Sequence, residues 1–146
     1  MQTIKRLDLA DAEALIAGAR AHAGALGVPM CVSVVDEAGH TIAFQRMDGA
    51  KVLSVRLADD KAFTAAVSRR PTHEYNELCI PGELTFGIHT SSGGRFSTVG
   101  GGFPVLQGRA VVGGIGCSDG AATEDMACAE AGIRHWRNKL KQKRKR

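Results

Sequence analysis

The chain has 146 residues, of which 44% are hydrophobic and 23% charged, and its formal net charge is +4. A chain of this length forms one domain and buries a core without needing disulfides or a structural metal. No apolar run approaches the roughly 18 residues of a membrane-spanning helix. Residues 1–15 carry no apolar signal segment, so we expect a cytoplasmic protein with no membrane partner.

The charge is unevenly distributed along the chain. Residues 137–146 hold seven of the 19 basic residues and no acidic one, so residues 1–136 carry 12 basic against 15 acidic residues, a net charge of −3. We therefore predict one domain over residues 1–136 and a basic C-terminal tail over residues 137–146. Basic tails bind nucleic acid in some proteins and are solvated helix ends in others. Because no aromatic residues are interleaved here, we expect no nucleic-acid partner.

The first half of the chain predicts a helix, a hairpin and a second helix. Residues 8–26 begin with an N-cap aspartate and continue with apolar or small residues at intervals of three and four. Residues 30–35 and 40–47 flank a four-residue turn and predict two antiparallel strands. Residues 52–67 have the pattern of an amphipathic helix, and Pro71 forbids its continuation.

The second half predicts a short helix, three strands and a final helix. The short helix covers residues 72–79, and the strands cover residues 95–99, 103–106 and 109–117. Thr123 is the predicted cap of the last helix. Five strands joined by short hairpins pair antiparallel, and helices on both faces of the sheet then give an α/β (α+β) fold, an α-β-α sandwich with a five-stranded antiparallel sheet.

Patterns that indicate nucleotide or metal binding are incomplete. Gly114-Ile115-Gly116 lies at the end of a predicted strand, but Asp119 replaces the third glycine of a dinucleotide fingerprint, and no further strand follows the last helix to complete a βαβ unit. The five histidines show no His-x-x-x-His pair and the four cysteines no Cys-x-x-Cys pair. We therefore predict no metal site, and four reduced thiols that are mostly buried.

Three loops carry residues that point to an anionic small-molecule ligand. The first joins a strand to a helix, whose free N–H groups attract anions. The other two are rich in glycine, which lets backbone amides approach a ligand and form anion-binding nests. Ordinary turn geometry would explain each loop equally well. The predicted ligand-binding residues are Arg46, Met47, Ser92, Gly93, Gly94, Arg95, Gly101, Gly102 and Phe103.

The same loops leave two other interpretations open. In an isomerase, tautomerase or lyase acting on an oxygenated acid, His89 would be the general acid or base. Arg46 or Arg95 would then hold the substrate carboxylate, and Glu83 is a reserve base. The catalytic candidates are thus His89, Arg46 and Glu83. Alternatively, the last helix and the basic tail serve an assembly protein that binds no ligand.

Short motifs follow one another in a fixed order from about residue 8 to residue 132. They include Val34-Val35-Asp36, Arg46-Met47-Asp48-Gly49-Ala50, Asp60-Lys61-Ala62, Arg69-Arg70-Pro71-Thr72, Ser92-Gly93-Gly94-Arg95 and Val112-Gly113. In this combination the chain resembles the GlcG/HbpS-like haem-binding family, which includes the C-terminal domain of the PduO proteins. The resemblance implies a profilin-like α-β-α sandwich, homo-oligomers from dimers to octamers, and haem, a related tetrapyrrole or an iron species as the ligand.

The chain departs from this family in the loop before the last helix. The family commonly reads Ser-Gly-Gly-Thr-Pro, whereas this chain reads Ser118-Asp119-Gly120-Ala121-Ala122. The threonine that the resemblance places near haem iron is therefore Ala121, whose methyl group offers iron no lone pair. Axial ligation would have to come from Thr123, Asp119 or a histidine instead.

Overall fold

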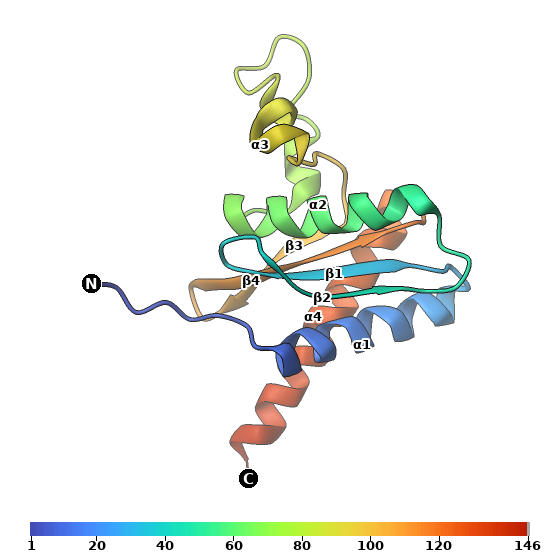
Figure 1. The fold of residues 1–146 in the computed structure, drawn as a ribbon, viewed down its shortest axis with the longest axis vertical. Helices are drawn as coiled ribbons and strands as arrows, with labels where there is room; N and C mark the ends of the chain where they lie inside the picture. The colour runs from blue at the N-terminus through green and yellow to red at the C-terminus, as the bar shows by residue number, and fades with distance from the viewer. Residues whose placement is uncertain (146) are drawn as a thin grey trace.

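A four-stranded antiparallel sheet lies between one helix on one face and two helices on the other (Figure 1). The computed structural model describes residues 1–145. The strands are β1 (Cys31–Asp36), β2 (Thr41–Arg46), β3 (Gly102–Gln107) and β4 (Ala110–Ser118), in the order β2-β1-β4-β3. The long helices are α2 (Val52–Ser68) on one face, and α1 (Leu9–Leu26) and α4 (Ala122–Arg144) on the other.

Local sequence signals set the ends of the first helix. The Asp8 carboxylate accepts a hydrogen bond from the Asp11 amide at 2.8 Å, which caps the N-terminus of α1. Gly27 ends the helix in the left-handed conformation, with φ at 70°. The Asp11 carboxylate also accepts a hydrogen bond from the Trp136 indole at 2.9 Å. This bond fastens α4 to the start of α1.

The two central strands lie between the helices and pack against both layers. All six residues of β1 are buried. Val32 and Val34 pack with α1 and α4, whereas Val35 packs with alanines of α2. Where α2 crosses β4 the strand has glycines, and a Cβ added at Gly116 would lie 2.5 Å from the Ala62 amide nitrogen. The helix therefore rests directly on the backbone of the strand.

The predicted fifth strand, residues 95–99, does not form. The Ser97 amide donates to the Thr64 hydroxyl at 2.8 Å, and the Val99 carbonyl accepts from the Thr72 hydroxyl at 2.6 Å. Side chains of α2 and of the segment after it thus satisfy this stretch of backbone, which removes its need for a strand partner. The prediction of a five-stranded sheet was wrong by this one strand.

The predicted helix over residues 72–79 is also shorter than expected. A 3₁₀ turn, η1, spans Thr72–Tyr75. Turns follow it, together with the short elements η2 (Ile88–Thr90) and α3 (Ser91–Gly94). We refer to residues 76–94 as the arm, because in Figure 1 this part of the chain projects beyond α2 and away from the sheet.

The basic tail continues α4 as one helix that runs past the rest of the molecule (Figure 1). The helix begins at Ala122, one residue before the predicted cap Thr123, and the Ala121 amide donates to the Glu124 carboxylate at 2.8 Å. Arg146 lies outside the described residues. No helix in the described part of the chain is both long and apolar enough to cross a membrane.

Candidate functional site

Arg46 and Met47 lie at the end of β2, at the edge of the sheet. They line a shallow hollow together with Arg20 and Phe44. The Arg46 guanidinium donates to the Ala50 carbonyl at 3.0 Å, and the Arg20 guanidinium donates to the Gln45 amide oxygen at 2.9 Å. Both cations are thus already engaged by neighbouring oxygens.

His89, Gly94 and Arg95 line a second hollow, of about 250 Å³, between the arm and α2. Arg95 forms ion pairs with Asp59 at 3.0 Å and with Asp60 at 3.1 Å. Its guanidinium also lies 4.0 Å from the centre of the Phe63 ring. Two carboxylates therefore neutralise this arginine, and it offers little charge to a ligand carboxylate.

The residues predicted for acid–base chemistry are not brought together. His89 shares its hollow with Arg95, as the acid–base interpretation requires. Arg46 lies in the other hollow, and Glu83 lies exposed within the arm. The geometry of the described chain thus supports His89 as a reactive group more than it supports the three-residue site.

The two glycine turns lie apart. Ser92, Gly93 and Gly94 have positive φ angles of 53°, 66° and 79° and are exposed within the arm. Gly101 and Gly102 are buried. The Gly102 amide donates to the Thr72 hydroxyl at 3.0 Å. A Cβ at Gly101 would lie 2.6 Å from the Cys117 carbonyl oxygen, so packing against β4 explains the glycine there.

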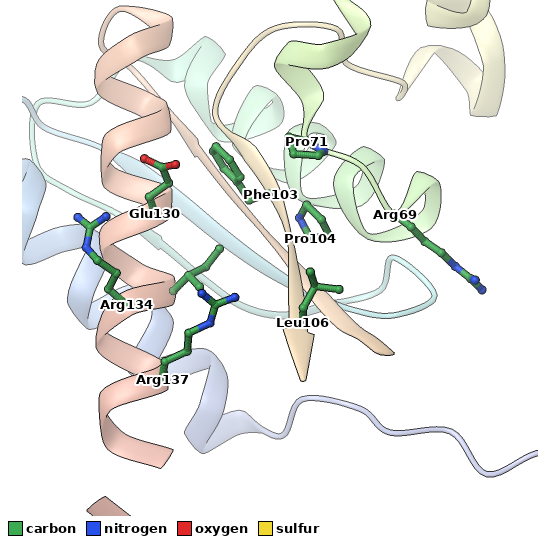
Figure 2. A pocket seen from close by; sticks show the side chains of 9 residues that line it. Arg69, Pro71, Phe103, Pro104, Leu106, Glu130, Arg134 and Arg137 are labelled. Carbon is green, nitrogen blue, oxygen red and sulfur yellow. The ribbon is translucent and has the colours of Figure 1, made fainter. Parts of the chain in front are cut away.

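Phe103 leads into a third hollow, which we call the β3–α4 groove (Figure 2). It lies between the outer edge strand and the last helix and has a volume of about 380 Å³. Five of its nine lining residues are apolar, and the other four carry three guanidinium groups and one carboxylate. The lining residues are Arg69, Pro71, Phe103, Pro104, Leu106, Glu130, Ile133, Arg134 and Arg137.

The groove holds cations that are free to meet a ligand. Within residues 1–145, no hydrogen bond or ion pair engages the guanidinium groups of Arg134 and Arg137. Figure 2 shows Phe103 and Arg137 extending into the space between α4 and β3, with Glu130 nearby on the same helix. Arg69 extends away from α4 in this view, and the guanidinium of Arg134 lies on the side of α4 away from β3. An apolar wall with unpaired cations at its edge suits a flat molecule that carries acidic groups.

The arginines of this groove were missed at the level of sequence. Glu130, Arg134 and Arg137 recur at intervals of four and three, which places them on one face of a helix. The prediction assigned the apolar residues of this helix to the core and treated Arg137 as part of a solvated tail. The spacing of these three residues shows that they share a helix face, but the sequence does not show that this face lies beside the strand of Phe103.

A buried ion pair lies at the centre of the molecule. The Lys61 ammonium lies 2.7 Å from the Asp125 carboxylate and 3.1 Å from the Cys117 carbonyl oxygen. Both side chains are almost fully buried, at 1% and 3% exposed. Burial raises the pKa of the Asp125 carboxyl, although the Lys61 hydrogen bond and charge oppose that shift. The pair connects α2, β4 and α4.

The loop of residues 118–122, where the chain departs from the family sequence, forms hydrogen bonds with the helices that flank it. The Asp119 carboxylate accepts from the Lys51 amide at 2.6 Å and from the Ser54 hydroxyl at 2.9 Å, both at the start of α2. The Gly120 amide donates to the Asp125 carboxylate at 3.0 Å. Asp119 thus stabilises the start of a helix and is not free to ligate a metal.

Three comparisons describe what the chain is similar to. A family model described as haem-degrading protein HbpS-like matches residues 7–134. Over 132 residues the chain is 36% identical to an uncharacterized 15.0 kDa protein of the dhaT-dhaS intergenic region in Citrobacter freundii, covering 90% of this chain and 93% of that protein.

Two solved structures are similar over most of their length. The crystal structure of Klebsiella pneumoniae protein ORFY matches with a TM-score of 0.91 and 31% identity, covering 93% of this chain and 94% of the other. The crystal structure of a PduOC:heme complex matches with a TM-score of 0.85 and 33% identity, covering 89% of this chain and 94% of the other.

Proposed function

The chain belongs to the HbpS-like family of haem-degrading proteins, and on that premise we propose that it binds haem, or another planar anionic small molecule, in the β3–α4 groove. The observation that carries the proposal is the pairing of an apolar wall with unpaired guanidinium groups. Phe103, one of the predicted ligand-binding residues, is part of that wall.

The two halves of a haem molecule match the two kinds of surface in the groove. The porphyrin face is flat and apolar, and Phe103, Pro104 and Ile133 offer it contact. The propionates are anionic, and Arg134 and Arg137 stand at the edge of the groove with no partner among residues 1–145. Hydrogen bonds between a guanidinium and a carboxylate are the stronger, charge-assisted kind.

The donor set bears on how the iron would be held. Glu130 is the carboxylate in the groove, and the groove is lined by no histidine, cysteine or methionine. Ala121 supplies no ligand, and Asp119 is engaged by α2. The residues present therefore fit the ring and the propionates, with the Glu130 carboxylate as the available oxygen ligand. Bound haem would supply redox chemistry and a site for small ligands of iron.

Titration of the purified protein with haemin tests the proposal. We expect a saturable shift of the Soret band. Arg134→Ala/Arg137→Ala should weaken binding by roughly tenfold or more, because a hydrogen bond to a charged group contributes about 1.5–3 kcal/mol. Lys139→Ala/Lys141→Ala is the matched control: it removes the same charge from the same helix outside the groove, and it should leave the affinity unchanged.

A second pair of variants separates the groove from the hollow beside β2. Arg20→Ala/Arg46→Ala removes the cations of that hollow. Weaker haemin binding in this variant, together with normal binding in Arg134→Ala/Arg137→Ala, would contradict the placement in the groove. A loss of binding that is equal in the tail control would show that the effect is general electrostatic attraction.

Two further expectations stay predictions. Assembly into dimers or larger rings, up to octamers, follows from the resemblance alone, and Val52 and Leu53 are exposed apolar side chains available to it at the start of α2. A cytoplasmic location stays an expectation from the sequence.

A further inference from the structure

The arm brings a thiol and an imidazole together outside the groove. Cys79 Sγ lies 3.0 Å from His89 Nδ1, although the two residues are ten positions apart in the chain. Between them the chain turns back, and the Thr85 hydroxyl donates to the Leu78 carbonyl. The Phe86 ring packs near the His89 ring, with 6.2 Å between their centres. The pair is therefore held by the local fold of the arm.

The pair is reachable from solvent and adjoins an open hollow. His89 is exposed and Cys79 is partly buried. His89 also lines the hollow of about 250 Å³ between the arm and α2, together with Gly94 and Thr98. A small reagent that enters this hollow thus arrives beside the imidazole that contacts the thiol.

The other three thiols are in the opposite situation. Cys31, Cys117 and Cys128 are fully buried in the body of the molecule. Burial raises the pKa of Cys31, raises that of Cys117 well above its ordinary value, and raises that of Cys128 to about 11. Since the thiolate is the reactive form of cysteine, these three thiols are protected in two ways: reagents in solvent do not reach them, and they stay protonated.

We propose that Cys79 and His89 form a thiol-oxidation site that reacts with hydroperoxides. The imidazole Nδ1 of His89 accepts the thiol proton, which leaves a thiolate at Cys79. The sulfur attacks one peroxide oxygen, so that an S–O bond forms, the O–O bond breaks, and the sulfur gives two electrons to the peroxide. The leaving hydroxide or alkoxide takes the proton from His89 and departs as water or an alcohol. Cys79 is then a sulfenic acid.

A thiol from outside the chain completes the cycle. The buried positions of Cys31, Cys117 and Cys128 keep these residues from reaching Cys79 in the folded chain. A low-molecular-mass thiol therefore condenses with the sulfenic acid, forming an S–S bond and releasing water. The product is a mixed disulfide in the arm, and a second thiol returns Cys79 to its reduced form by exchange. The site thus reacts with peroxide without needing haem.

Trapping with dimedone tests this site. The full-length protein is treated with hydrogen peroxide and dimedone at pH 7, and the adduct is mapped by peptide mass spectrometry. We expect one adduct, on Cys79, and none in Cys79→Ser. His89→Ala should slow its formation on the order of tenfold because the thiol loses its base. His135→Ala, which removes an exposed imidazole from α4, should not change the rate.

His89→Gln separates a base from a mere hydrogen-bond partner. Glutamine keeps an acceptor near Cys79 but does not take up a proton, so this variant should be as slow as His89→Ala. Unchanged rates in both variants, or labelling of Cys31, Cys117 or Cys128 as fast as Cys79, would overturn the proposal. Haemin binding by Cys79→Ser should equal that of the wild type, so failure of one proposal is distinguishable from failure of the other.

Discussion

Two pairs of ionisable side chains lie at hydrogen-bonding distance in very different parts of the molecule. Lys61 and Asp125 are 2.7 Å apart in the core, where both are almost fully buried. Cys79 and His89 are 3.0 Å apart in the arm, next to solvent. The distances are similar, but the first pair cannot separate without leaving a buried charge, whereas the second can exchange protons and partners with water. Surroundings, more than distance, decide whether such a pair stabilises a fold or reacts.

The core pair should give the largest effect on stability. Lys61→Met keeps most of the side-chain volume but leaves the Asp125 carboxylate buried without its cation. We expect the free energy of unfolding to fall by about 3–5 kcal/mol, measured by urea denaturation. Lys51→Met is the matched control, because Lys51 is exposed, and it should cost less than about 1 kcal/mol.

A second substitution at the same site sharpens this test. In the Lys61→Met background, Asp125→Asn removes the stranded charge, while its amide oxygen still accepts from the Gly120 amide. We expect this change to restore roughly 1–3 kcal/mol. A Lys61→Met protein as stable as the wild type would show that the core pair is no more important than a surface contact.

Arg95 is intermediate in burial and should be intermediate in effect. Its side chain is 27% exposed and pairs with Asp59 and Asp60. Arg95→Ala should lower the free energy of unfolding by about 1–2 kcal/mol, since it loses two partly screened ion pairs and a cation–π contact. Arg56→Ala removes a more exposed partner of Asp60 and should cost less than about 0.5 kcal/mol. Equal costs in both variants would contradict the dependence on burial.

The arm pair should contribute least to stability. Cys79→Ser and His89→Ala each change a side chain that lies at or near the surface and outside the core, so the free energy of unfolding should change by less than about 0.5 kcal/mol. The same two variants are expected to change thiol reactivity strongly. A destabilisation comparable to that of Lys61→Met would mean that the arm pair stabilises the fold, and it would contradict the difference between the two pairs.

Most of the fold was predictable because its signals are local. The Asp8 cap and Gly27 bound the first helix, and a β-branched apolar run followed by a turn predicts the hairpin of residues 30–47. The segment at residues 95–99 was predicted as a strand and is not one, although Phe96 and Ser97 within it are buried. Its backbone partners are hydroxyl groups from Thr64 and Thr72, and the sequence pattern carries no sign of these distant contacts.

The candidate sites were less predictable, because each depends on residues far apart in the chain. Phe103 was identified, but its partners Arg134 and Arg137 come from α4, about thirty residues later. His89 was identified, but the contact with Cys79 depends on how the arm turns. The Gly101 turn is explained by close packing against β4. Sequence reasoning thus found individual residues and could not assign their neighbours.

The glycines of β4 have a consequence for which parts of this molecule can vary. Because α2 rests on bare strand backbone at Gly114 and Gly116, any side chain there would act as a wedge under the helix. The tilt would carry Lys61 away from Asp125 and, through Asp59 and Asp60, displace Arg95 as well. The two glycines thus keep the Lys61–Asp125 pair and the Arg95 ion pairs in place. Substitutions should be tolerated better in the arm than on this strand.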